Sequence, residues 1–198
     1  LAYLGLLSHY LGDNEAAHEY SQQALFIAQE LGNRYIQGYA LTNLGHALVG
    51  LGRLDEAAHA YQQALALRRE LGQHHLAMEP LAGLARVSLA QGNLSQAQAQ
   101  VEEVLGHLET HTPSTGPSAT SGHGLEGTDE PFRVYLTCYR VLRANQDPRA
   151  QAILNTGYSL LQEQATKISD EELRRSFLEN VAAHREIVEE MRTLKRLV

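Results

Sequence analysis

Cysteine is almost absent from this sequence of 198 residues, in which Cys138 is the only example. A single thiol excludes an internal disulfide and any zinc site built from several cysteines. Cys138 lies in an apolar helical stretch, where the expected role is that of a small buried side chain. The chain also lacks an apolar run of roughly 18 residues and an export leader at its start, so we expect a cytoplasmic protein with no membrane partner.

Positive charge is scarce in the first part of the chain. Residues 1–110 contain 5 Lys or Arg against 11 Asp or Glu, so 5 − 11 gives −6 of the total net charge of −7. An acidic surface repels the phosphate backbone of nucleic acids. We therefore expect no direct nucleic-acid partner, and a neutral or basic protein surface suits this segment better.

Motifs that carry chemistry are missing as well. The sequence has no glycine-rich phosphate loop and no Gly-x-Ser-x-Gly elbow for a nucleophilic serine. Among the ten histidines, His107 and His111 have the i, i+4 spacing that places two imidazoles on one helical face. No carboxylate is positioned to complete a ligand set, and solvated histidines explain the pattern. We predict no enzyme activity, no metal and no cofactor.

What the chain does contain is an internal repeat, whose period is the constant interval that separates Gly12 from Gly52 and Gly52 from Gly92. An alanine follows each of these glycines at the same distance. The strings at 22–25 and 62–65 are both Gln-Gln-Ala-Leu. Repeats of about 20–50 residues are units that bury their apolar face only by stacking on their neighbours. The period therefore predicts a solenoid.

Each repeat is predicted to be a pair of antiparallel helices. Apolar and small residues between Ala40 and Leu51 follow the 3.6-residue period, and Gly52 then ends the helix. A second apolar face runs from Ala57 to Leu71, and acidic residues in its first turn suit the positive end of the helix dipole. Small residues at Gly5, Gly45 and Ala85 are expected to let the first helix lie close against Ala17, Ala57 and Ala97 of the second.

The repeat resembles the tetratricopeptide repeat. The residues that carry the resemblance are Asn43-Leu44-Gly45, Leu51-Gly52, Ala57 and Tyr61-Gln62-Gln63-Ala64-Leu65. The usual unit of that family has about 34 residues, and the longer unit here looks like the repeats of the kinesin light chain, of polarity adaptors and of bacterial regulators. The resemblance implies an all-α, right-handed superhelix of antiparallel helix pairs that binds protein partners without catalysis.

The pattern divides the chain into four parts. Residues 1–109 are predicted to form three repeats, of which the first lacks its beginning, and residues 110–130 a flexible loop rich in Gly, Ser, Thr and Pro. Residues 131–168 are expected to form a degenerate fourth pair in which Gln146 replaces the turn glycine. A capping box opening at Ser169 predicts one long helix over 169–198 that caps the array, and a dimerising coiled coil is the alternative.

The resemblance also implies which residues bind a partner. In that family the first helix of each pair lines a concave groove, and an asparagine before the Leu-Gly pair of its long-form members bonds to the backbone of a bound peptide, a role that falls to Asn43 here. Ordinary solvated helix surface is the alternative for every one of these positions. The predicted peptide-binding or partner-binding residues are Tyr39, Thr42, Asn43, His46, Glu79 and Arg86.

The function that follows is a non-catalytic scaffold that holds a peptide or a partner domain in this groove. The stretch 122–190 resembles the C-terminal ends of large bacterial signalling and regulatory proteins, so we expect a module of such a protein, with further segments preceding Leu1. The alternatives are a self-association module that forms a homodimer, and a regulatory domain that senses a peptide or ligand.

Overall fold

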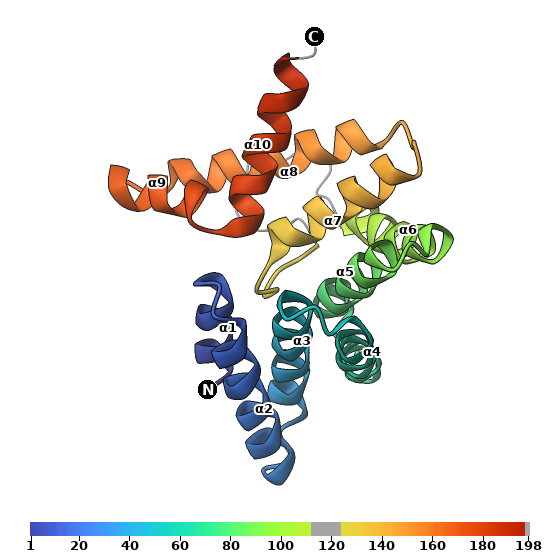
Figure 1. Ribbon diagram of the computed structural model, residues 1–198, viewed down its shortest axis with the longest axis vertical. Helices are drawn as coiled ribbons and strands as arrows, with labels where there is room; N and C mark the ends of the chain where they lie inside the picture. The colour runs from blue at the N-terminus through green and yellow to red at the C-terminus, as the bar shows by residue number, and fades with distance from the viewer. Residues whose placement is uncertain (112–123, 197–198) are drawn as a thin grey trace. The chain divides into compact units, whose positions relative to one another are not determined.

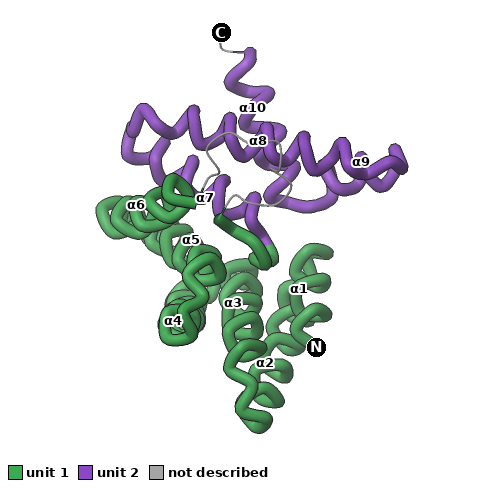
Figure 2. The backbone as a smooth tube through the Cα atoms, turned by 180° about the vertical axis from the view of Figure 1, so that it is seen from behind, with its two compact units in different colours: residues 1–129 green, residues 130–198 purple. Residues whose placement is uncertain are grey.

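The computed structural model describes residues 1–111 and 124–196, and all regular structure in these ranges is helical. The chain divides into two compact units, residues 1–129 (unit 1) and residues 130–198 (unit 2), which Figure 2 colours separately. No helix within the described ranges is both long and apolar enough to cross a bilayer.

The described part of unit 1 contains six helices, which are labelled in Figure 1. The helices α2, α4 and α6 begin one sequence period apart, as do α3 and α5, so the sequence period is also the structural period. Their bounds are α1 Ala2–Tyr10, α2 Asn14–Glu30, α3 Arg34–Gly50, α4 Leu54–Glu70, α5 His74–Ala90 and α6 Leu94–His111.

The turn that separates consecutive helices has one recurring form. Gly52 has a φ of +74°, and the amide nitrogen of Gly52 donates to the carbonyl oxygen of Val49 at 3.0 Å. The amide of the next residue, Arg53, donates to the carbonyl of Leu48 at 2.9 Å. These bonds satisfy carbonyls that the end of α3 would otherwise leave without partners, and the left-handed conformation that they need favours glycine.

Helices of unit 1 pack in sequence order, each against the next. In addition, α1 contacts α3 and α3 contacts α5. The first helices of the three pairs therefore lie side by side and form one face of the unit, to which we refer as the inner face. The inner face is the surface on which the sequence predicts the binding residues.

One aromatic ring joins the second and third pairs. Tyr61 of α4 is fully buried, and its ring fills the space that the missing side chains of Gly45 and Gly83 leave on α3 and α5. A methyl group added to Gly45 would lie 2.4 Å from the ring carbon Cε1 of Tyr61, and one added to Gly83 would lie 2.5 Å from Cζ. The three atoms nearest to a methyl group at Gly45 would all belong to the Tyr61 ring.

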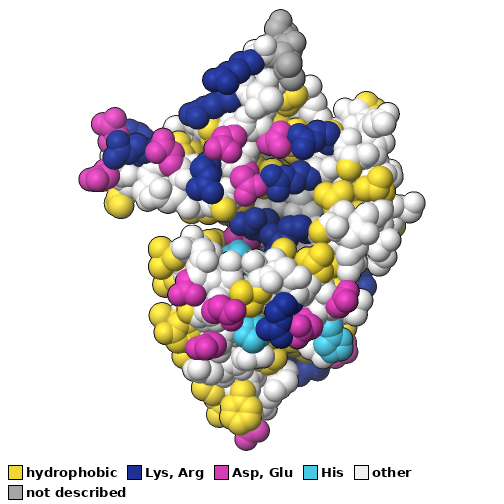
Figure 3. Space-filling view, in the orientation of Figure 1, with side chains coloured by type: hydrophobic (Ala, Val, Ile, Leu, Met, Phe, Trp, Pro, Cys, Tyr) yellow, Lys and Arg dark blue, Asp and Glu magenta, His cyan; other side chains and the backbone are white. Residues whose placement is uncertain are grey.

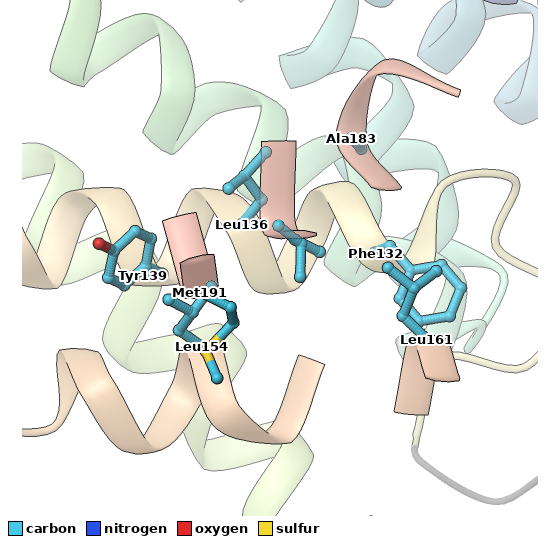
Figure 4. Packing of buried hydrophobic residues seen from close by; sticks show 8 residues of the cluster. Phe132, Leu136, Tyr139, Leu154, Leu161, Ala183 and Met191 are labelled. Carbon is cyan, nitrogen blue, oxygen red and sulfur yellow. The ribbon is translucent and has the colours of Figure 1, made fainter. Parts of the chain in front are cut away.

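Unit 2 contains four described helices: α7 Pro131–Ala144, α8 Ala150–Thr166, α9 Glu171–Glu179 and α10 Ala182–Arg196. Helices α7 and α8 pack against each other, and Gln146 in the turn between them has a φ of +56°. Figure 4 shows the core, which α10 shares with both helices. Its buried residues are Phe132, Leu136, Tyr139, Leu154, Leu161, Ala183, Ile187 and Met191.

The end of the chain differs from the single capping helix predicted over 169–198, because the helix is interrupted after Glu179. The N-cap of α9 is Asp170, whose carboxylate accepts from the amide of Leu173 at 2.8 Å, and the predicted capping by Ser169 is wrong. At the break, His184 Nδ1 donates to the carbonyl of Phe177 at 2.8 Å. This ring supplies a partner that the interrupted helix no longer provides, while burial lowers the pKa of His184.

Candidate functional site

A short segment of the chain itself lies against the inner face. The hydroxyl of Tyr10 on α1 donates to the carbonyl of Asp129 at 2.9 Å, and that of Tyr39 on α3 donates to the carbonyl of Gly127 at 2.8 Å. From α5, the carboxylate oxygen Oε2 of Glu79 accepts from the amide of Asp129 at 2.9 Å. Each of the three first helices thus contributes one side chain to residues 124–129, which we call the resident segment.

The resident segment is held mainly by its backbone. A fourth bond joins His107 Nε2 on α6 to the carbonyl of Gly124 at 2.8 Å. Leu125 is only 6% exposed, whereas Glu126 and Gly127 are exposed. Backbone contacts of this kind recognise the conformation of a peptide backbone rather than its side chains. Grooves bind extended segments in this way. The only buried apolar side chain in this segment is that of Leu125.

Tyr39 is positioned by a buried arginine. The guanidinium carbon of Arg68 lies 4.3 Å from the centre of the Tyr39 ring and 5.3 Å from that of Tyr35, within the range of a cation–π contact. Arg68 is 1% exposed and donates through Nη1 to Gln73 Oε1 at 2.6 Å. It passes over Gly38, where a methyl group would lie 2.5 Å from the guanidinium carbon.

Burial governs the electrostatics of this cluster. It raises the pKa of Tyr39, and the hydrogen bond with Tyr35 raises it further. The two hydroxyl oxygens are 3.2 Å apart, and because Tyr39 donates its proton to Gly127, Tyr35 is the donor between them. The same burial lowers the pKa of Arg68. The phenol of Tyr39 therefore stays protonated, as a donor to a peptide carbonyl requires.

Behind the contact residues lies a buried polar network. His46 Nε2 donates to Glu79 Oε1 at 3.1 Å, and the hydroxyl of Tyr61 lies 2.8 Å from His46 Nδ1. Arg86 Nη2 donates to the Tyr61 hydroxyl at 3.0 Å. One oxygen of Glu79 therefore binds this network while the other binds the amide of Asp129. The network fixes the carboxylate that holds the resident segment.

The six residues predicted from the sequence fall into two groups. Tyr39 and Glu79 contact the resident segment directly, and they stand one period apart, at equivalent positions of two repeats. The other four are largely turned into the structure: His46 and Arg86 belong to the polar network, and Thr42 donates to the carbonyl of Gly38 at 2.9 Å. Asn43 is buried and donates to the backbone carbonyl of Ala2 on α1 at 3.4 Å.

Site residues that were not predicted include Tyr10, His107 and Arg68. Tyr10 is the last residue of α1, and its counterparts in the next two repeats are Gly50 and Ala90, so no repeated pattern marks it. Arg68 and His107 lie on second helices, which the groove argument leaves aside. The pair of tyrosines at Tyr35 and Tyr39, one helical turn apart, is the sequence feature from which a nearby buried cation such as Arg68 could have been predicted.

Among the residues that the structure describes, no group of three or more His, Cys, Asp or Glu side chains is placed to hold a metal ion. The rings of His107 and His111 stack at 4.1 Å between centroids. His107 binds the resident segment and His111 Nδ1 lies 2.9 Å from the carbonyl of His107. Both histidines therefore have protein partners, and His123 lies outside the described residues.

A second surface feature of unit 1 is apolar. Large apolar side chains are exposed along α1, and Figure 3 shows them at the edge of the unit. The exposed apolar residues of α1 and the turn that follows it are Tyr3, Leu4, Leu7 and Leu11.

Comparison with known proteins supports the repeat. The family model described as tetratricopeptide repeat matches residues 1–70 and 36–110, which together span more than half of the chain. No curated protein matches the sequence significantly.

Two solved structures show a fold similar to that of this chain. One is a putative kinesin light chain of Podosopora anserina with nearly identical TPR-like repeats, at 18% identity and a TM-score of 0.59 over 99% of this chain and 89% of that chain. Another is BtubC (BKLC) of P. vanneervenii, at 20% identity and a TM-score of 0.60 over 98% of this chain and 74% of that chain. At sequence identities this low, the similarity shows a shared fold and nothing more.

Proposed function

This chain belongs to the tetratricopeptide repeat family, and from that premise we propose that unit 1 is a non-catalytic module that holds a peptide segment of a partner protein on its inner face. Tetratricopeptide arrays mediate contacts between proteins, and stacked helix pairs create an extended face for this purpose. The wider setting that we propose is a cytoplasmic signalling or regulatory protein of a bacterium, on the resemblance of residues 122–190 to such proteins.

The observation that carries the proposal is the set of three side chains that reach the resident segment. Tyr10, Tyr39 and Glu79 come from three successive first helices, and all three bind main-chain atoms of residues 127–129. A surface that already binds one peptide backbone has donors and an acceptor placed for another. The buried Arg68 and the polar network hold two of these three groups in position.

The proposal is tested with peptides selected from a random display library on the full chain carrying Gly127→Val, because a β-branched residue at this positive φ loosens the resident segment and opens the inner face to the peptides. Each hydroxyl donates one hydrogen bond worth about 1 kcal/mol. Replacing both Tyr10 and Tyr39 by phenylalanine is therefore expected to lower the affinity for the selected peptides about tenfold or more. Affinity is measured by fluorescence anisotropy with synthetic copies of the peptides.

The matched control is Tyr20→Phe, which removes a phenolic hydroxyl from α2, outside the inner face. It should leave the affinity unchanged. If the selected peptides bind the chain without the two hydroxyls as tightly as they bind the parent Gly127→Val chain, the binding surface lies elsewhere. A homodimer through the apolar residues of α1 is the second candidate, and light scattering of the chain over a range of concentrations distinguishes it.

A further inference from the structure

We propose that the resident segment is an internal ligand that a partner peptide of the same chemistry replaces, and this inference rests on the proposed function. The partner is a short peptide with a leucine, a glycine two residues later and, after two more residues, any residue that has a backbone N–H. These are the features through which Leu125, Gly127 and Asp129 are held.

Each feature of this peptide follows from one contact. Gly127 has a φ of +76°, a conformation that L side chains rarely adopt, and its carbonyl accepts from Tyr39. Asp129 donates through its amide to Glu79, which proline would not do, and accepts from Tyr10 through its carbonyl. Leu125 is buried. The side chains of the intervening residues contribute little to recognition.

The resident segment is suited to exchange because it is held largely through its backbone. It has no helix or strand of its own, and Glu126 and Gly127 are exposed. The hydrogen bonds that hold it to the first helices end on Tyr10, Tyr39 and Glu79, which a second peptide can use in the same way. We therefore expect the helix pairs to stay folded when the segment is released.

A tethered ligand competes strongly with a free one. A segment joined to its site by a short chain has an effective concentration in the millimolar range. The apparent affinity of a free peptide equals its intrinsic affinity multiplied by the fraction of molecules in which the inner face is vacant. The unmodified chain should thus bind such a peptide weakly, and any change that loosens the resident segment alone should strengthen that binding.

The experiment uses a fluorescent synthetic peptide with the sequence of residues 124–130 and measures its anisotropy against the full chain. Gly127→Val places a β-branched residue at a positive φ and brings its Cβ to 3.4 Å from Leu76 Cδ2. This change weakens the resident segment and leaves the helices untouched. The peptide is expected to bind the Gly127→Val variant about tenfold more tightly than the unmodified chain.

Two controls locate the effect. Glu126→Ala changes an exposed side chain of the resident segment and should not alter the affinity of the peptide. Adding Tyr39→Phe to the Gly127→Val variant removes the donor to the peptide carbonyl and should reverse most of the gain. Leu125→Ser is a second way to loosen the segment, and far-UV circular dichroism confirms that each variant keeps its helices.

The outcomes separate this inference from the proposed function. Equal affinity for the unmodified chain and for both loosened variants overturns the exchange, and if Tyr39→Phe still weakens the peptide, the inner face remains a peptide-binding surface. Absence of binding to all variants overturns the claim that this sequence is a ligand. The proposed function then depends on the selected peptides alone.

Discussion

Replacing Tyr61 by alanine is expected to lower the free energy of unfolding by about 4 kcal/mol, within the range measured for large aromatic residues in protein cores. The ring is fully buried and packs against Gly45 and Gly83, which have no side chains to close the space that it would leave. The change also removes a hydroxyl that His46 and Arg86 share. Urea denaturation followed by circular dichroism measures the loss.

Tyr61→Phe separates packing from hydrogen bonding. It keeps the ring and removes only the hydroxyl, so the expected loss is about 1–2 kcal/mol. Tyr3→Ala, at a position on α1 that is 77% exposed, should change the free energy of unfolding by less than about 0.5 kcal/mol. If the free energy of unfolding of the Tyr61→Ala variant lies within about 1 kcal/mol of that of the unmodified chain, this ring does not join the two repeats.

The second large effect is expected in unit 2. Ile187 of α10 is fully buried in the core that α10 shares with α7 and α8. Ile187→Ala should lower the stability of this unit by about 3 kcal/mol through lost burial and the cavity left behind. Thermal melting followed by far-UV circular dichroism measures the shift.

Leu173→Ala is the matched control, because Leu173 lies on the neighbouring helix α9 and is 64% exposed. It should have little effect. If the Ile187 and Leu173 variants lose the same stability, α10 is not an integral part of the unit 2 core.

The repeat could be predicted because it is encoded locally and three times over. A turn glycine recurs in every copy at the same position, and Gly52 takes the positive φ that this position requires. Such a period fixes where helices start and end without reference to distant parts of the chain. The same register identified Tyr39 and Glu79 as equivalent positions, and both contact the resident segment.

The C-terminal break could not be predicted from periodicity. Apolar residues recur every four positions at Leu173, Phe177 and Val181, across the interruption, so this pattern gives no sign of a break. The break depends on tertiary contacts: the rings of Phe177 and His184 both pack against Phe132 of α7. Packing of this kind decides between one helix and two.

The resident segment is also beyond local reasoning. Its bonds join Asp129 to Glu79 and to Tyr10, which are 50 and 119 residues away in the sequence. The chain between 110 and 130 has no helical period, so the sequence predicted a flexible loop there. Residues 112–123 lie outside the described residues, while residues 124–129 make specific contacts with unit 1.

The most direct test of the claim that the first helices hold a peptide backbone is hydrogen exchange at the Asp129 amide. This amide donates to Glu79, whose carboxylate is buried. In the full chain we expect it to exchange more slowly than in a free peptide of residues 124–130, and Glu79→Ala should remove that protection. Exchange at the free-peptide rate in the unmodified chain would contradict the account.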